Sequence, residues 1–266
     1  MPAPPCRPAR SRSAPSTRPW RSAPACSAAP STRPAPNRDG PIVTEIAAGA
    51  FITFEGGEGA GKSTQVQRLA AHLRVRTNRP VVVTREPGGS PKAEAIRDAL
   101  LAGIAKPHGP FAEALLFSAA RIDHLDTLIR PALARGETVL CDRFADSTRA
   151  YQGAAGGLDP ELVTSLERVV VGPTRPALTL ILDLDPVVGL ARAAGRSDGA
   201  PDRFEAEALD FHARLRAAFR AIAEAEPERC ALVDAGAAPD AVAAEIRAIV
   251  AARLPTLLRK AGDDAA

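Results

Sequence analysis

The chain has 266 residues, of which 45% are hydrophobic and 24% are charged, values typical of a soluble globular protein with one large or two small domains. No apolar run approaches the roughly 18 residues of a membrane span, and the four cysteines show no metal-binding spacing. These features argue against a membrane protein, a cysteine metal site and a disulfide framework, so a reducing cytoplasm is the expected location.

The formal net charge of +3 belongs to the N-terminal segment. Residues 1–40 carry seven arginines and one acidic residue, out of totals of 34 basic and 31 acidic residues. The remaining residues therefore carry 27 basic and 30 acidic side chains, a net charge of −3. A mildly acidic folded part argues against a nucleic-acid-binding protein.

The two ends of the chain are predicted to lie outside the folded domain. Residues 1–46 are rich in Pro, Ala, Ser and Arg, which favours a disordered extension. This segment resembles a transit peptide, but its many prolines oppose an amphipathic helix. The alternative is a non-functional upstream extension, with translation starting near Val43. We expect one folded domain at 47–256 and a flexible tail at 257–266.

Strand and helix patterns alternate from residue 50 onward. The expected strands are Ala50–Glu55, Pro80–Thr84, Thr138–Cys141, Leu178–Leu184 and Ala231–Val233. The expected helices are Gly61–Arg74, Pro91–Leu101, Phe111–Arg135 with a break or kink at Pro131, Pro160–Val171, Pro186–Ala194, Glu205–Ala225 and Asp240–Leu254. This alternation predicts an α/β fold of three layers, a five-stranded parallel sheet with helices on both faces. Ligands of such folds bind at the carboxyl ends of the strands.

A glycine-rich motif connects the first strand to the first helix. Residues Gly56 to Ser63 read Gly-Gly-Glu-Gly-Ala-Gly-Lys-Ser, a complete G-x4-G-K-S in the required strand–helix context. Its N–H groups can turn toward phosphates, and the helix start adds a positive dipole end. Lys62 can reach the β- and γ-phosphates of ATP, and the Ser63 hydroxyl can bind Mg²⁺. A chance match is on the order of one in a hundred for this length, so the segment is a nucleotide-binding loop.

Five ordered segments together resemble the thymidylate kinase family over Phe51–Leu254. They are Phe51 to Gln65 around the loop, Thr84-Arg85-Glu86-Pro87-Gly88-Gly89, Asp142-Arg143-Phe144 with Ser147 to Gly153, Leu182 to Pro186, and Asp202-Arg203-Phe204-Glu205. The only asparagines, Asn37 and Asn78, do not begin the Asn-Lys-x-Asp of regulatory GTPases. The resemblance implies a P-loop kinase fold with a small lid at about 192–204. It also implies reversible transfer from ATP to dTMP with Mg²⁺, giving dTDP and ADP for dTTP biosynthesis, and a homodimer.

The resemblance also assigns roles to individual residues. The implied catalytic residues are Lys62, Arg143, Arg196 and Glu58. The implied ATP-binding residues are Gly56, Gly57, Glu58, Gly59, Ala60, Gly61, Lys62, Ser63, Thr64, Arg192 and Arg196, with Ser63 as the metal ligand. The implied dTMP-binding residues are Arg85, Pro87, Phe117, Arg121, Arg143, Ser147, Thr148, Tyr151 and Gln152.

Residue patterns alone leave alternatives for several of these roles. Phe117 and Arg121 share a helix face, as thymine stacking and donation to its O4 require, but spacing alone favours a core Phe beside a surface Arg. Arg143 suits an acceptor phosphate, although a surface pair with the preceding acid fits the pattern as well. Asp183 fits a carboxylate near Mg²⁺ at the end of the fourth expected strand, and it fits equally well a residue that caps or pairs within the core.

Residue patterns also leave alternative roles for the arginine of the lid and for the single tyrosine. Arg196 lies among small and polar residues and is our candidate for the arginine that enters the site; a solvated basic loop is the alternative. In the family, the tyrosine at the Tyr151 position packs near the sugar C2′ and disfavours a ribose hydroxyl, while an ordinary packing role also fits.

Two other functions compete with the one the resemblance implies. The first is a kinase for another nucleoside monophosphate or for a deoxynucleoside. Adenylate kinases usually carry glycine where Ser63 stands, which counts against that version. The second is a nucleotide-dependent binding module without transfer activity. The presence of Lys62, Arg143 and an arginine-bearing lid argues against this module.

Overall fold

Five parallel strands form the sheet of the computed structural model, which describes residues 49–77, 79–195 and 203–258. These residues all belong to the unit Thr44–Ala266. The strand order is β2-β3-β1-β4-β5, and every adjacent pair is parallel. The strands are β1 (Phe51–Gly56), β2 (Val81–Arg85), β3 (Thr138–Asp142), β4 (Leu178–Asp183) and β5 (Cys230–Asp234). The predicted α/β class and its five parallel strands are confirmed.

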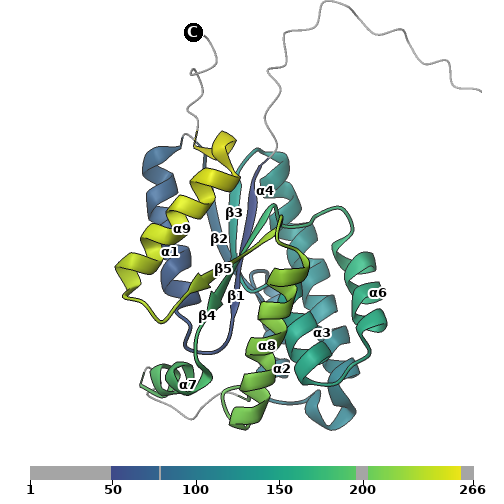
Figure 1. Ribbon diagram of the computed structural model, residues 1–266. Coiled ribbons are helices and arrows are strands. Elements are labelled where there is room, and N and C mark those ends of the chain that lie inside the picture. The colour runs from purple at the N-terminus through teal and green to yellow at the C-terminus, as the bar shows by residue number, and fades with distance from the viewer. Residues whose placement is uncertain (1–48, 78, 196–202, 259–266) are drawn as a thin grey trace, which may run out of the picture. The chain divides into compact units, whose positions relative to one another are not determined.

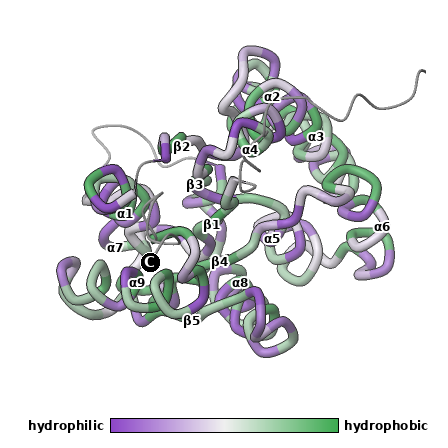
Figure 2. Tube along the Cα trace, turned by 90° about the horizontal axis from the view of Figure 1, so that it is seen from above, coloured by the Kyte–Doolittle hydropathy of each residue, from purple (hydrophilic) through white to green (hydrophobic). Residues whose placement is uncertain are grey.

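Helices cover both faces of this sheet, with α1 and α9 on one face and α3, α4 and α8 on the other (Figures 1 and 2). The α-helices are α1 (Lys62–Arg76), α2 (Pro91–Leu101), α3 (Gly109–His124), α4 (Arg130–Ala134), α5 (Ala145–Thr148), α6 (Pro160–Val171), α7 (Pro186–Ala194), α8 (Leu209–Ala225) and α9 (Pro239–Arg253). Two π-helical segments, η2 (Leu125–Ile129) and η3 (Arg149–Ala155), and two short 3-10 helices, η1 (Lys106–His108) and η4 (Pro255–Leu257), complete the described elements. None of the described helices is long and apolar enough to cross a bilayer.

Alternation of side chains along β1 separates the core into two layers. Ile52 and Phe54 point toward α1 and α9, where Leu69 belongs to the same buried cluster. Phe51 points to the opposite face and packs edge-on against Phe144 at 4.9 Å between ring centroids. Every residue of β1 is buried, as expected for a strand with helices on both sides.

Two predicted helices differ in detail from the structure. The helix predicted over Phe111–Arg135 has its irregularity just before Pro131, where it widens into η2, and it then continues as α4. Proline lacks an N–H donor and its ring crowds the carbonyl four residues before it, so the preceding turn opens instead. The helix predicted from Glu205 begins at Leu209, and Phe204 packs against the Tyr151 ring at 5.4 Å.

The order of the strands brings three chain segments to one edge of the sheet. Phe54 of β1 lies beside Asp142 of β3, and Gly56 lies beside Leu182 of β4. The glycine-rich loop after β1 therefore starts next to the Asp142–Arg143 pair, although these segments lie more than 80 residues apart in the sequence.

Candidate active site

The glycine-rich loop leaves β1 at Gly56 and enters α1 at Lys62. Gly59 has φ +67°, and a Cβ at this position would lie 1.9 Å from the carbonyl oxygen of Gly189 in α7. This close contact admits only glycine. The Lys62 ammonium donates to the carbonyl oxygens of Gly56 (3.1 Å) and Gly57 (2.7 Å), so it lies inside the curve of the loop.

Burial and the neighbouring charge of Arg143 lower the pKa of Lys62 from 10.5 to about 8, against the opposing attraction of Glu58 and Asp142. The folded protein without nucleotide therefore binds this proton less tightly than the unfolded chain does. Because the unfolded chain holds more protons between pH 8 and 10.5, this group makes stability rise with pH across that window. A polyphosphate beside the ammonium favours the charged form and restores the higher pKa.

We therefore expect ATP binding at about pH 8.5 to take up a proton, because Lys62 must be charged to bind phosphate. Calorimetric titrations in two buffers of different ionisation enthalpy measure this uptake directly. The matched control is Lys62→Arg, whose guanidinium stays protonated and should lose the uptake. Equal uptake by both proteins would assign the proton to another group.

Ser63 and Asp142 form a candidate magnesium site. The Ser63 hydroxyl donates to Asp142 Oδ2 at 2.5 Å, at the point where β3 ends beside the loop. Mg²⁺ in phosphotransferases is usually held by one or two carboxylates together with substrate phosphates, and this pair fits that donor set. The part of the chain that the structure describes contains no cluster of three or more His, Cys, Asp or Glu side chains that could hold a metal alone.

Asp183 forms a partly exposed ion pair at the end of β4, so it has a pairing role and not a metal-binding one. Its carboxylate accepts hydrogen bonds from Arg216 at 2.7 and 2.9 Å and from Arg220 at 3.0 Å. The hydrogen bonds and charge of Arg216, against some burial, lower the pKa of Asp183. Asp142, and not Asp183, is the carboxylate beside Ser63.

Glu58 joins the loop to the other half of the site. Its Oε1 accepts from Arg143 Nη2 at 2.7 Å and from the Tyr151 hydroxyl at 2.5 Å. Burial alone would raise the pKa of Glu58, but the charges of Arg143 and Lys62 and the Tyr151 hydrogen bond outweigh it and lower this pKa to about 2. Glu58 is thus ionised at neutral pH, and burial together with this carboxylate raises the pKa of Tyr151 well above 10.

Glu55, the residue before the loop, fixes the turn that carries Arg143. Its Oε1 accepts from the backbone N–H groups of Phe144 (2.8 Å) and Ser147 (3.2 Å), and its Oε2 lies 2.6 Å from the Ser147 hydroxyl. Arg143 itself has φ +67°, the only positive value at a non-glycine residue in the described chain. Burial, followed by the charge of Asp146, raises the pKa of Glu55 to about 8.

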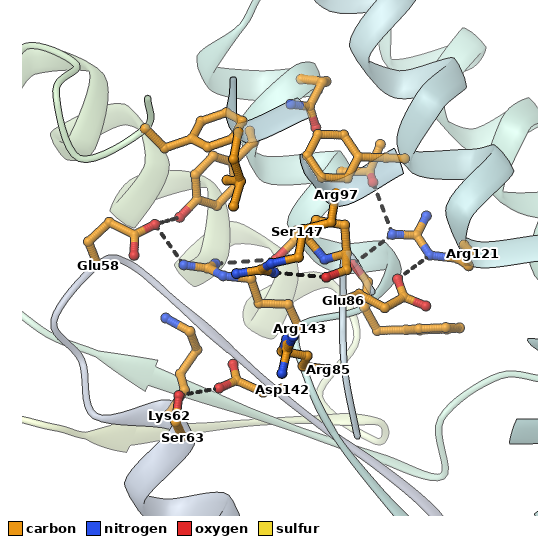
Figure 3. A pocket seen from close by; sticks show the side chains of 18 of the residues that line it. Glu58, Lys62, Ser63, Arg85, Glu86, Arg97, Arg121, Asp142, Arg143 and Ser147 are labelled. Atoms are coloured by element: carbon orange, nitrogen blue, oxygen red, sulfur yellow. Dashed lines mark hydrogen bonds and ion pairs between the residues drawn. The ribbon is translucent and has the colours of Figure 1, made fainter. Parts of the chain in front are cut away.

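A cavity of about 220 Å³ lies between the loop and the helices that follow β2 and β3. Figure 3 shows the Glu58–Arg143 pair and the Glu86–Arg121 pair at separate places around it, with Lys62, Ser63 and Asp142 grouped together. The predicted residues that line the cavity are Glu58, Gly59, Gly61, Lys62, Ser63, Arg85, Pro87, Phe117, Arg121, Arg143, Ser147, Thr148, Tyr151 and Gln152. The structure therefore brings residues predicted for the donor and for the acceptor around one cavity.

Aromatic and amide side chains line the cavity near Arg121. Phe117 of α3 lies 6.3 Å from Phe204 between ring centroids. The Thr148 hydroxyl accepts from Arg121 Nη2 at 3.2 Å, and Gln152 Nε2 donates to Glu113 at 3.3 Å. Phe117 and Arg121 are thus not a core phenylalanine beside a surface arginine: both line the cavity, and Arg121 is buried.

Five other predicted residues do not line this cavity in the described chain. Gly56 and Gly57 border a smaller pocket toward β4, and Ala60 is buried in the core below the loop. Thr64 is exposed on α1, and Arg192 of α7 donates to the Ala235 carbonyl oxygen at 3.0 Å. Arg196 and most of the predicted lid lie outside the described residues.

Six residues of the cavity were not among the predicted site residues: Glu86, Arg97, Leu101, Asp142, Phe144 and Phe204. Asp142 and Glu86 lie within the sequence motifs, next to Arg143 and Arg85, but only the arginines were assigned roles. Arg97 on α2 carries no signal of its own, because only the packing of α2 brings it to the cavity. Phe204 lies in the Asp202–Glu205 motif but was given no role, whereas its ring contacts those of Phe117 and Tyr151.

Comparison with known proteins agrees with this geometry. A family profile described as thymidylate kinase matches residues 54–246. Thymidylate kinase of Rhodopseudomonas palustris (strain TIE-1) is 62% identical over 211 residues, 77% of this chain and 90% of the relative. That of Caulobacter vibrioides is 57% identical over 206 residues, 77% and 98% of the two chains. The crystal structure of thymidylate kinase from Ehrlichia chaffeensis aligns with a TM-score of 0.63 at 32% identity, over 76% of this chain and 99% of that chain. The chain therefore belongs to the thymidylate kinase family of phosphotransferases.

Proposed function

We propose that the chain transfers the γ-phosphoryl group of ATP to dTMP, reversibly, giving ADP and dTDP for dTTP synthesis in the cytoplasm. One observation carries this proposal. Lys62 of the phosphate-binding loop lines the same cavity as Phe117, Arg121 and Arg143, the residues proposed to bind the acceptor. Phosphoryl transfer requires this arrangement, because the donor and acceptor phosphates must meet in line.

On the donor side, the phosphates of ATP bind to the N–H groups of the loop and to Lys62. Ser63 and Asp142 would hold Mg²⁺, which would neutralise charge on the phosphates. Arg192 is proposed to contact ATP, because it follows Gly189 by one turn on α7 and Gly189 packs directly on Gly59. The same role is proposed for Arg196.

On the acceptor side, Arg143 binds the phosphate of dTMP. Its guanidinium is held by Glu58 and by the Gly56 carbonyl oxygen at 3.0 Å, between the loop and the cavity. An acceptor phosphate oxygen is already anionic, so the transfer needs no strong general base. Positioning by Arg143 and charge stabilisation by Lys62 provide the catalysis, without a covalent enzyme intermediate.

Recognition of thymine is proposed for Phe117 and Arg121. The Phe117 ring stacks on the base, and Arg121 donates to its O4. Tyr151 lies near the sugar and disfavours a ribose hydroxyl. The Tyr151 hydroxyl is fixed by Glu58, and the Arg143 guanidinium lies 5.0 Å above its ring, so the tyrosine cannot easily move aside.

The test is ADP release measured in a coupled assay with dTMP, dUMP, dCMP, dGMP and AMP as acceptors. Release that is fastest with dTMP supports the proposal. Faster release with another acceptor identifies a different monophosphate kinase, and no release with any acceptor favours a nucleotide-binding module.

A homodimer is the second part of the proposal, supported by an apolar stripe on α3. Phe111, Leu115 and Ile122 are all exposed and lie on one face of the helix at spacings of four and seven residues. A second copy of the chain can cover the same stripe through a twofold axis. We expect Leu115→Asp to convert a dimer into a monomer, because the carboxylate would be buried unpaired at the interface.

Light scattering coupled to gel filtration measures this change in mass. The control is Val75→Asp on α1, where another exposed apolar residue lies on the other side of the sheet and the dimer should persist. A monomeric unsubstituted protein, or a dimer that survives Leu115→Asp, would contradict the assignment of this face.

A further inference from the structure

A chain of buried polar side chains runs from β2 to Arg121 behind the cavity. The Thr84 hydroxyl and His124 Nε2 are 2.7 Å apart, His124 Nδ1 and Glu86 Oε1 are 3.1 Å apart, and Arg121 Nε donates to Glu86 Oε2 at 2.7 Å. The side chains of His124, Arg121 and Glu86 are at most 5% exposed. Polar groups buried this deeply are costly unless they are paired, so the arrangement is specific.

The chemistry of the groups fixes the direction of these hydrogen bonds. The Glu86 carboxylate, paired with the Arg121 guanidinium, can only accept, so Nδ1 of His124 carries a hydrogen and donates to it. In this Nδ1–H tautomer, Nε2 accepts the hydrogen of the Thr84 hydroxyl, which lies 2.7 Å away. Thr84 thereby sets the orientation of His124, and His124 sets that of Glu86.

Gly89 shows how closely this chain is packed. Its φ is +84°, and a Cβ on this residue would lie 2.4 Å from His124 Nε2 and 2.5 Å from Thr84 Oγ1. The backbone therefore lies directly over the Thr84–His124 hydrogen bond, and no side chain fits there. Three residues of the Thr84–Gly89 motif, namely Thr84, Glu86 and Gly89, thus converge on His124, which comes from a different segment.

These contacts leave the Nη1 group of the Arg121 guanidinium available to donate to a ligand. Nε is held by Glu86, and Nη2 donates to the Phe144 carbonyl oxygen at 3.1 Å and to Thr148. No hydrogen bond within the described residues engages Nη1, and Arg121 lines the cavity. Figure 3 shows the guanidinium of Arg121 joined to Glu86 on the cavity side of α3.

We propose that Thr84, His124 and Glu86 form a positioning relay that holds the Arg121 guanidinium in the orientation that recognises the C4 oxygen of the acceptor base. The inference rests on the proposed function, since it assigns to Arg121 the thymine O4. A guanidinium held at Nε by a fixed carboxylate cannot rotate, so Nη1 donates in one direction only. The relay therefore contributes to base selectivity and makes no contact with ATP.

The experiment compares the binding of dTMP and of 5-methyl-dCMP by titration calorimetry. The two nucleotides share the ring methyl, sugar and phosphate, but 5-methyl-dCMP carries an amino group at C4, which cannot accept from Arg121. We expect His124→Leu to weaken dTMP binding about tenfold, as for loss of a charge-assisted hydrogen bond, and to change 5-methyl-dCMP binding less than about twofold. The KM for ATP should also change less than about twofold.

Three further variants keep the test decisive. His124→Asn places an amide N–H close to the position of Nδ1 and should restore dTMP binding to within about threefold of the wild type. Thr84→Val, which keeps the side-chain volume, should act in the same direction as His124→Leu, and it replaces that variant if His124→Leu does not fold. Ser90→Ala is the control: Ser90 Oγ donates to Asp123 at 2.7 Å beside the relay, so its loss should leave both affinities unchanged.

Equal losses of affinity for dTMP and 5-methyl-dCMP would show that His124 has only a structural role and would overturn the relay. Unchanged dTMP affinity in both His124→Leu and Thr84→Val would overturn it as well. Failure of the proposed function looks different. In that case the unsubstituted protein itself would bind the two nucleotides equally and would not release ADP with dTMP.

Discussion

Replacement of Arg143 by alanine is expected to lower kcat/KM for dTMP by about 10³–10⁵, or about 4–7 kcal/mol of transition-state stabilisation. Arg143 contacts Glu58 and the Gly56 carbonyl oxygen and lines the cavity, so its positive charge joins the loop to the acceptor side. Steady-state rates with dTMP as the variable substrate measure the loss. The KM for ATP should change far less, because Lys62 and the loop remain.

The backbone at this position requires its own control. Arg143 has φ +67°, which costs energy for alanine but not for glycine. Arg143→Gly should therefore lose as much activity as Arg143→Ala while unfolding at a higher temperature than it. If Arg143→Gly were much more active than Arg143→Ala, the loss would come from backbone strain. A loss below about tenfold in both variants would remove Arg143 from phosphate binding.

Lys62→Met is expected to lower kcat by about 10²–10³, the usual cost of removing one donor from a developing charge in a closed site. The methionine keeps the length of the buried side chain but cannot bind the β- and γ-phosphates. Because the pKa of Lys62 is about 8 before nucleotide binds, the substitution should also remove the rise in stability between pH 8 and 10.5. Single-turnover kinetics and pH-dependent urea unfolding measure the two effects.

The matched control for Lys62→Met is Lys92→Met, at an exposed lysine on α2 whose nearest acid, Asp123, is 3.9 Å away. This variant should retain the wild-type rate and pH dependence. Retention of more than about a tenth of the wild-type kcat by Lys62→Met would mean that the loop N–H groups and Mg²⁺ stabilise the transferred phosphoryl group without the lysine.

The sequence alone determined the fold class and the loop, because both depend on local patterns. Buried strands alternate with amphipathic helices, and the spacing from Gly56 to Ser63 suits only a phosphate-binding turn between them. The ordered motifs contain Arg143 and Tyr151, and the family resemblance that they carry implied Arg121 as well. Two helices differ from the prediction, since Pro131 opens the preceding turn into η2 and α8 begins at Leu209 instead of Glu205.

Only the tertiary structure decided how these residues are paired. Asp142 and Asp183 both end a buried strand, and only the sheet order puts one beside Ser63 and the other beside Arg216. In the sequence, His124 is one of four scattered histidines with no assigned role. In the fold, the end of α3 places it between Thr84 and Glu86. The physical reason is that ion pairs and hydrogen bonds depend on distances of about 3 Å between atoms. Residues far apart in sequence reach such distances only when the core is packed.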